Sequence, residues 1–120
     1  MAIKALHVDD DEDIGFLVQM GLEMSGDYEV RWVDSGKEAL DVVEEWVPNL
    51  IILDVMMPEM DGPTTLKMLR KKARMADVPV VFLTAKGERE FDYLRSIGAQ
   101  GAINKPFNPT ALAEQLKAYI

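Results

Sequence analysis

The sequence has no cysteine and a single histidine, His7, among its 120 residues. The absence of cysteine excludes disulfides, thiolate metal sites and cysteine nucleophiles, and it suits a reducing cytosol. No apolar run approaches the ~20 residues that span a bilayer, and the N-terminus has no signal-peptide pattern, so we expect a cytoplasmic protein without membrane contact. Basic residues are outnumbered as well, 13 against 21 acidic ones, which argues against direct binding to a nucleic-acid backbone.

The charges that are present are unevenly distributed along the chain. Residues 1–61 hold 16 acidic and 3 basic residues, whereas residues 62–120 hold 5 acidic and 10 basic ones. Five of the acidic residues are consecutive, at positions 9–13. We therefore expect the first half of the chain to contain a site that attracts cations.

Short β-branched runs alternate with longer stretches of helical periodicity. The pattern predicts strands at about 3–8, 28–33, 49–53, 79–83 and 100–104, and helices at about 12–25, 35–46, 63–75, 87–97 and 108–119. The third strand is apolar at successive positions, which is typical of a strand covered on both faces. We therefore predict one α/β domain over residues 1–120, with a parallel sheet between two layers of helices.

In such a sheet the binding site forms outside the carboxyl ends of the strands. The residues found there are Asp9, Asp10 and Asp11 after the first strand, Asp54 after the third, Thr84 after the fourth and Lys105 after the fifth. Clustered carboxylates repel one another, and oxygen ligands without cysteine favour Mg²⁺, or Mn²⁺ as the alternative, over zinc. A lysine and a hydroxyl facing that metal suit phosphoryl oxygens, which predicts phosphoryl transfer onto or off an aspartate.

Four segments then carry a family resemblance. HVDDDEDI at 7–14, LIILDVMMPEMDG at 50–62, VVFLTAKG at 80–87 and GAINKPF at 101–107 together resemble the CheY-like receiver domain of two-component response regulators. The resemblance covers the whole chain, with the motifs in the family's order and at its spacing. It implies a doubly wound, flavodoxin-like (βα)5 domain, in which five helices flank a parallel sheet of strand order 2-1-3-4-5.

The resemblance also implies a role for each site residue. Asp54 would be the phosphoacceptor, taking a phosphoryl group from a phosphohistidine on a sensor histidine kinase or histidine phosphotransfer protein. Asp10, Asp54 and the main-chain carbonyl of Met56 would bind Mg²⁺, with Asp9 holding it through water or from the second shell. The domain would promote its own phosphorylation and dephosphorylation without being an enzyme.

Lys105 and Thr84 complete the implied site. Lys105 would pair with Asp54 and then with the phosphoryl group, while the Thr84 hydroxyl would turn inward to bond a phosphoryl oxygen. The peptide between Lys105 and Pro106 would be cis, as it is in the family.

The sequence departs from the family at two places. Ala102 stands where the family's switch has tyrosine or phenylalanine, so we hypothesise that the loop after Thr84 and the fourth helix, with Phe91 and Tyr93, carry the signal. Met56 and Lys86 flank the path of the hydrolysing water and are poorly suited to orient it. We therefore predict slow loss of the phosphoryl group.

Other functions are left open by these residues. The Asp9–Asp11 run also fits the D-x-D motif of a small haloacid-dehalogenase-type phosphatase, which would need further acids after Lys105, where only Glu114 follows. A receiver-like interaction module that is never phosphorylated is the third reading. The chain ends at Ile120 without an output domain, so we expect either a stand-alone receiver or the N-terminal domain of a larger protein, with an unidentified output target.

Several charged residues are expected to play structural roles. His7 lies inside the first predicted strand, so we expect a structural role for it and not that of a phosphocarrier or ligand. Glu12 and Asp13 should be solvated at the start of the first helix, where anions suit the helix dipole. The basic run, which is Lys67, Arg70, Lys71, Lys72 and Arg74, is interpreted as a solvated face at the end of the third helix.

Overall fold

The computed structural model describes residues 2–85 and 88–120, in which strands and helices alternate along the chain. The strands are β1 (Ile3–Val8), β2 (Tyr28–Val33), β3 (Leu50–Asp54), β4 (Val80–Thr84) and β5 (Gly101–Asn104). The helices are α1 (Glu12–Met24), α2 (Gly36–Glu45), α3 (Gly62–Arg70), α4 (Glu88–Ser96) and α5 (Pro109–Lys117), with a 3₁₀ helix, η1, at Ala73–Met75. Every predicted strand and helix is present. Residue 87, with which the fourth predicted helix starts, lies outside the described residues.

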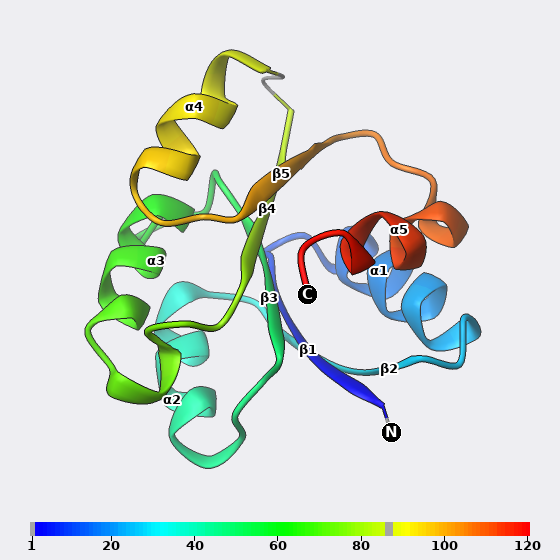
Figure 1. Ribbon diagram of the computed structural model, residues 1–120, viewed down its shortest axis with the longest axis horizontal. Coiled ribbons are helices and arrows are strands. Elements are labelled where there is room, and N and C mark those ends of the chain that lie inside the picture. The colour runs from blue at the N-terminus through cyan, green and yellow to red at the C-terminus, as the bar shows by residue number, and fades with distance from the viewer. Residues whose placement is uncertain (1, 86–87) are drawn as a thin grey trace.

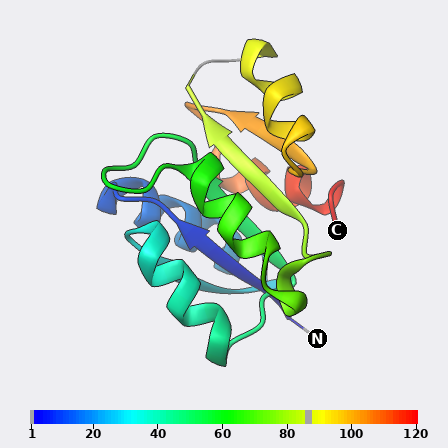
Figure 2. The same ribbon diagram turned by 90° about the vertical axis from the view of Figure 1, so that its left-hand side faces the viewer.

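All five strands run parallel in one sheet with the order β2-β1-β3-β4-β5, which confirms the predicted fold. Figure 1 shows α1 and α5 on one face of the sheet and α2, α3 and α4 on the other, and in Figure 2 the latter face is turned toward the viewer. Because the strands are parallel, their carboxyl ends meet at one edge. The chain changes direction across the sheet between β1 and β3, which is where ligands bind in folds of this type.

The interior strands β3 and β4 are buried along their whole length. Their side chains point alternately into two apolar clusters. Ile51, Leu53 and Phe82 belong to the cluster beneath α2, α3 and α4, whereas Leu50 and Ile52 belong to the cluster beneath α1 and α5. Each of these two strands is therefore packed on both faces. This packing fixes the position of the residues at their carboxyl ends.

The ends of the helices follow local signals in the sequence. The side-chain oxygens of Ser35 and Asn108 accept N–H hydrogen bonds from the first turns of α2 and α5. Gly26 and Gly98, which follow α1 and α4, have φ angles of 81° and 112°, a conformation that a side chain would strain. These four residues lie at or next to ends of the helices predicted at 12–25, 35–46, 87–97 and 108–119.

The third helix ends at Arg70, not at residue 75 as predicted. The Arg70 guanidinium donates hydrogen bonds to the main-chain carbonyls of Met75 and Val78, both at 2.7 Å, and of Gly98, at 2.9 Å. It thereby ties the end of α3 to the segments that lead into β4 and β5. The interpretation of the basic run as a solvated face is therefore wrong for Arg70. Its guanidinium donates hydrogen bonds to main-chain carbonyls that have no partner within a helix or a strand.

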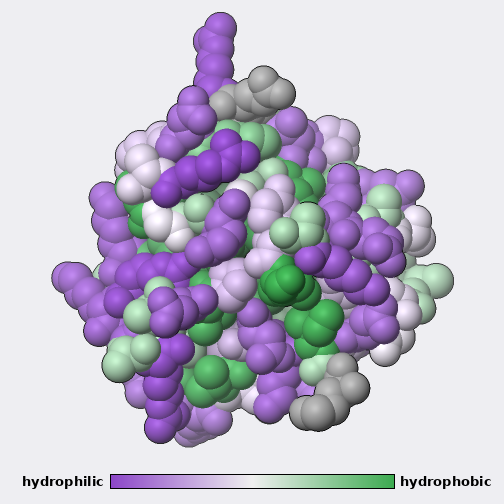
Figure 3. Space-filling model, viewed as in Figure 1, coloured by the Kyte–Doolittle hydropathy of each residue, from purple (hydrophilic) through white to green (hydrophobic). Residues whose placement is uncertain are grey.

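Some large apolar side chains are exposed on the surface of the domain. The face seen in Figure 3 is mostly hydrophilic, with hydrophobic residues confined to patches. Phe16, Met20 and Met24 are exposed on α1 and, at four-residue spacing, share one side of that helix. Within residues 2–85 and 88–120, no helix is long and apolar enough to cross a lipid bilayer.

Candidate functional site

Three carboxylates meet at the carboxyl edge of the sheet. Val8 of β1 pairs with Leu53 of β3, so Asp9 and Asp10 leave β1 beside Asp54, the last residue of β3. One carboxylate oxygen from each of the three aspartates lies within 4.8 Å of the other two. Asp9 and Asp54 are buried, whereas Asp10 is exposed. The three aspartates therefore lie at the predicted strand edge and within ligand distance of one cation.

The aspartates line a cleft of about 270 Å³. Its other lining residues are Asp11, Val55, Met56, Thr84, Ala85, Glu90 and Lys105. The loop after Asp54 folds back closely, since the Gly62 N–H donates to the Val55 carbonyl and a Cβ at Gly62 would lie 2.2 Å from the Asp54 carbonyl oxygen. Only glycine fits there, and the tight return fixes the end of β3 in the cleft.

Lys105 reaches this cluster from the end of β5. Its Nζ donates a 2.8 Å hydrogen bond to Asp54 Oδ1 and lies 3.6 Å from Asp9 Oδ2. Its main-chain N–H donates to the Thr84 carbonyl, which fixes the root of the side chain beside β4. Burial by itself would lower the pKa of Lys105, but the two carboxylates outweigh it and raise that pKa, so the ammonium stays charged.

The two buried carboxylates are affected differently by their surroundings. Burial raises the pKa of Asp54, and the negative charge of Asp9 raises it further. The hydrogen bond from Lys105 lowers this pKa but does not cancel the rise. Burial would raise the pKa of Asp9 too, but the nearby His7 imidazole, the Asp11 N–H and the Lys105 charge together lower it. Asp54 is thus the carboxylate whose ionised form most needs a further positive charge.

The cluster has the properties of a cation site. Asp9 Oδ2 is buried and has no hydrogen-bond partner among the described residues, with only the 3.6 Å contacts to His7 and Lys105 beside it. Three carboxylates facing one ammonium leave an excess of negative charge. Oxygen donors of this kind are the ligands that Mg²⁺ takes in proteins, so Asp9, Asp10 and Asp54 fit such an ion.

Thr84 also lies in the cleft, but with a partner that the sequence did not indicate. Its Oγ1 donates a 2.6 Å hydrogen bond to Oε1 of Glu90, on the first turns of α4. Glu90 belongs to none of the sequence motifs. Its distance from Thr84 along the sequence does not predict that the two side chains meet. Lys86, which the sequence placed beside the hydrolytic water, lies outside the described residues.

Trp32 and Gly15, which the sequence analysis did not single out, lie behind the aspartates. The indole Nε1 of Trp32 on β2 donates a 2.9 Å hydrogen bond to the main-chain carbonyl of Asp9. The ring lies against Gly15 of α1, where a Cβ would come within 2.7 Å of the indole nitrogen. Asp11 caps α1 by accepting N–H hydrogen bonds from Asp13 and Ile14, so it has a structural role at the rim of the cleft.

Comparison with known proteins decides the family. The sequence profile described as "Response regulator receiver domain" matches residues 5–117. The chain belongs to this family. Alkaline phosphatase synthesis transcriptional regulatory protein PhoP of Bacillus subtilis is 43% identical to this receiver domain over 119 residues, which are 98% of the chain and 48% of PhoP. The chain thus spans about half the length of the curated relatives it matches.

Solved structures of receiver domains have the same fold. Chemotaxis response regulator CheY4 of Vibrio cholerae superposes with a TM-score of 0.92 at 32% identity, covering all of both chains. The receiver domain of sensor histidine kinase PA1611 from Pseudomonas aeruginosa superposes with a TM-score of 0.86 at 25% identity, covering 99% of this chain and 98% of that one. That structure has a magnesium ion coordinated in its active-site cleft.

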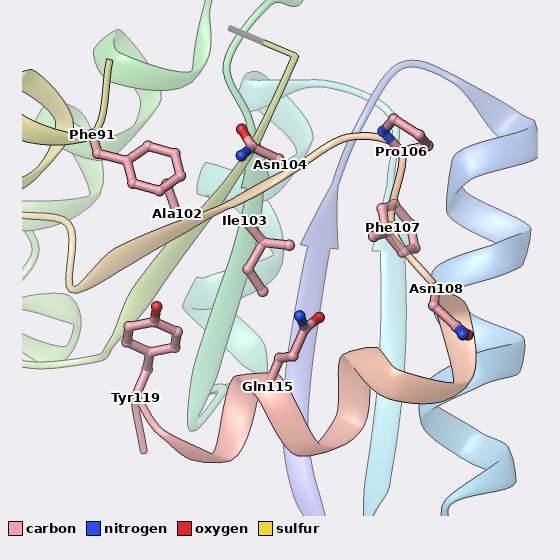
Figure 4. Close-up of a pocket in the computed structure, with 9 residues that line it drawn as sticks. All are labelled: Phe91, Ala102, Ile103, Asn104, Pro106, Phe107, Asn108, Gln115 and Tyr119. Atoms are coloured by element: carbon pink, nitrogen blue, oxygen red, sulfur yellow. The ribbon is translucent and has the colours of Figure 1, made fainter. Parts of the chain in front are cut away.

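The receiver domain also has a groove away from the cleft. Figure 4 shows the groove, of about 490 Å³, between α4, β5 and the end of α5, with the Phe91 ring directed toward Ala102. Phe91 packs against the same apolar cluster as Ala102. An aromatic side chain of α4 thus covers the place on β5 where the family usually has an aromatic residue. The Lys105–Pro106 peptide beside the groove is cis, as expected.

Proposed function

We propose that Asp54 of this receiver domain accepts a phosphoryl group from a phosphohistidine on a sensor histidine kinase or histidine phosphotransfer protein. The observation that carries the proposal is the 2.8 Å bond between Lys105 and Asp54, within a cluster of carboxylates at the topological switch point. A carboxylate that acts as a nucleophile without a metal ion needs no further acidic residues beside it. A carboxylate that reacts with the help of a bound cation needs such residues to bind that cation. No observation favours the phosphatase or the unphosphorylated module.

In the proposed reaction an Asp54 carboxylate oxygen attacks the phosphorus. The new O–P bond forms as the P–N bond to the donor histidine breaks, and the electron pair of that bond returns to the imidazole nitrogen, which takes up a proton from water. The product is an aspartyl phosphate, and hydrolysis by water returns the Asp54 carboxylate and inorganic phosphate. Transfer of this type needs positioning and charge neutralisation more than covalent chemistry from the protein.

Mg²⁺, with Mn²⁺ as an alternative, is the proposed cofactor. Asp10, Asp54 and the main-chain carbonyl of Met56 would bind it directly, and Asp9 would hold it through water. When bound, such an ion neutralises charge on the phosphoryl oxygens. Asp9 fits its part because its Oδ2 is buried without a hydrogen-bond partner among the described residues.

Lys105 and Thr84 would hold the transferred group. The Lys105 ammonium, already at Asp54, can follow the charge from the carboxylate to the phosphoryl oxygens with a small movement. The Thr84 hydroxyl, in the same cleft, can donate to a phosphoryl oxygen after it rotates. The Met56 side chain is exposed and apolar at the rim, which supports slow hydrolysis because it cannot orient a water molecule.

We also propose how residues 1–120 meet their partners as one receiver domain in the cytoplasm. The exposed apolar stripe Phe16, Met20 and Met24 on α1 supports docking of the phosphodonor protein there. The groove between α4, β5 and α5 would contact the output target. That target would be a separate protein or a fused domain, since PhoP and the other curated relatives are about twice as long as this chain.

The decisive experiment is exposure to acetyl phosphate with and without Mg²⁺, followed by intact mass spectrometry. We expect one base-labile phosphoryl adduct that needs Mg²⁺ and is absent from Asp54→Ala. Asp13→Asn, which removes an exposed carboxylate of α1, is the matched control and should form the adduct normally. An adduct that persists in Asp54→Ala, or none in the wild type, contradicts the proposal.

A further inference from the structure

The Glu90 carboxylate reaches the cleft from a helix that no family motif includes. It lines the same cleft as Asp54 and Lys105, and it accepts the 2.6 Å hydrogen bond that the Thr84 hydroxyl donates. Thr84 is buried and is the last residue of β4. A charged acceptor this close makes a stronger hydrogen bond than a neutral one.

This bond competes with the role proposed for Thr84. A hydroxyl has one proton and can donate it to one acceptor at a time. If that proton goes to a phosphoryl oxygen on Asp54, Glu90 loses it. The two anions also repel each other inside the cleft, where burial weakens the screening by water. The arrangement with Glu90 bonded to Thr84 and the arrangement with a phosphoryl group bonded to Thr84 therefore exclude one another.

We infer that Glu90 is a positioning residue that acts through Thr84: it holds the hydroxyl away from Asp54 and so lowers the affinity of the cleft for a phosphoryl group. The inference rests on the proposed function, because it assigns a competitor for the same hydroxyl. It requires no movement of the sheet. The outcome depends on whether the Thr84 hydroxyl donates its proton to Glu90 or to a phosphoryl oxygen.

The competition also connects the cleft to α4. Glu90 is followed in the chain by Phe91, whose ring is directed toward Ala102 on β5. When Thr84 turns to a phosphoryl group, the helix loses a charge-assisted bond that holds its first turns to the end of β4. The side chain that covers Ala102 is carried by those turns, so a local exchange of hydrogen bonds loosens the packing at the groove.

Beryllofluoride with Mg²⁺ is the probe, because BeF₃⁻ binds a carboxylate in the shape of a phosphoryl group and needs no kinase. Its affinity is measured by isothermal titration calorimetry on the full chain. Glu90→Ala should bind beryllofluoride about tenfold more tightly than the wild type, the gain expected when a charged hydrogen bond no longer competes. Glu90→Gln, which keeps an acceptor oxygen but loses the charge, should show a smaller gain.

Two comparisons make the result specific. Asp92→Asn removes a carboxylate from the same helix whose side chain is 99% exposed, and it should leave the affinity unchanged. In a Thr84→Ala background, Glu90→Ala should have no further effect, because the group through which Glu90 acts is gone.

Each outcome has one meaning. A gain that persists in the Thr84→Ala background, or affinity in Glu90→Ala equal to that of the wild type, overturns the inference and leaves phosphorylation of Asp54 intact. Failure of the wild type to bind beryllofluoride, together with no adduct from acetyl phosphate, overturns the proposed function itself.

Discussion

Lys105 Nζ and Asp54 Oδ1 are joined by a 2.8 Å hydrogen bond across 51 residues of sequence. Their strands β3 and β5 are not neighbours, because β4 lies between them. The lysine therefore reaches over the end of β4, where Thr84 lies, and also comes within 3.6 Å of Asp9. One ammonium thus contacts both buried carboxylates of the cleft and offsets only part of their negative charge.

We predict that Lys105→Met increases the affinity for Mg²⁺ while it slows phosphorylation. The ammonium repels a cation at the aspartates, and at a separation of a few ångströms its loss should tighten Mg²⁺ binding about tenfold. Calorimetric titration with Mg²⁺ measures this directly. Lys37→Met, at an exposed site on α2, is the control. An unchanged or weaker affinity in Lys105→Met would show that the lysine does not oppose the cation.

Hydrolysis of the proposed aspartyl phosphate should accelerate in Met56→Asn. The Met56 side chain is 67% exposed at the rim of the cleft, and an amide in its place can hold a water molecule toward the phosphorus. We expect an increase of about tenfold, as for other gains in orienting a reactant. The time course of adduct loss by intact mass measures it, with Met24→Asn on α1 as the control. Slower or equal decay in Met56→Asn contradicts the prediction.

Removing the Arg70 side chain should destabilise the fold without changing the cleft. Arg70→Ala leaves three main-chain carbonyls without the donor that they have now, and we expect a loss of about 2–3 kcal/mol in the free energy of unfolding. Urea denaturation measures this loss. Lys67→Ala, an exposed cation on the same helix, should change stability by less than about 0.5 kcal/mol. Equal effects of the two substitutions would mean that the carbonyls find other donors.

The cap of α3 should make stability depend on pH. The Asp61 carboxylate accepts a 2.8 Å hydrogen bond from the Thr64 N–H, and hydrogen bonding to Thr64 holds its pKa below the usual 3.8. A lowered folded-state pKa stabilises the fold above the unfolded value, and this stabilisation disappears as the pH falls through the folded value. Asp61→Ala should therefore cost about 1 kcal/mol near neutral pH, and less in acid.

Urea denaturation at about pH 7 and about pH 3 tests the cap. Asp61→Asn is the matched variant, since it keeps the capping oxygen and loses the charge. It should retain most of the stability of the wild type at neutral pH, with a smaller change on acidification. If Asp61→Ala and the wild type differ by the same amount at both pH values, the carboxylate does not supply the pH dependence.

The residues at the carboxyl ends of the strands could be predicted from the sequence, because strand ends are defined by hydrophobic pattern and parallel strands end at one edge. Asp54 and Lys105 follow from that rule alone. Glu90 and Arg70 could not be predicted. Their roles depend on the direction in which a long side chain leaves a helix and on which loop then lies beside it. The distance between two residues along the sequence predicts neither the direction of a side chain nor the loop beside it.

The end of α3 illustrates the same limit. Residues 71–75 have the composition of a helix, and local preference predicts that the helix continues. The chain instead leaves the helix after Arg70, where the guanidinium binds the carbonyls of Met75 and Val78. Tertiary hydrogen bonds outweigh a small local preference here. By contrast, the cap at Ser35 was predictable, since the signal and its effect lie within one turn.

The bond from Trp32 to the Asp9 carbonyl gives the chain a natural fluorophore at its cleft. Indole emission responds to nearby charge, so a cation arriving at Asp9 and Asp10 changes the emission of Trp32 without any label. Trp46, the second indole, lies before β3 at the opposite end of the sheet, beside Arg31 at 4.8 Å from its ring centre. We expect its emission to change little on cation binding, so occupancy of the cleft can be followed optically in the unmodified protein.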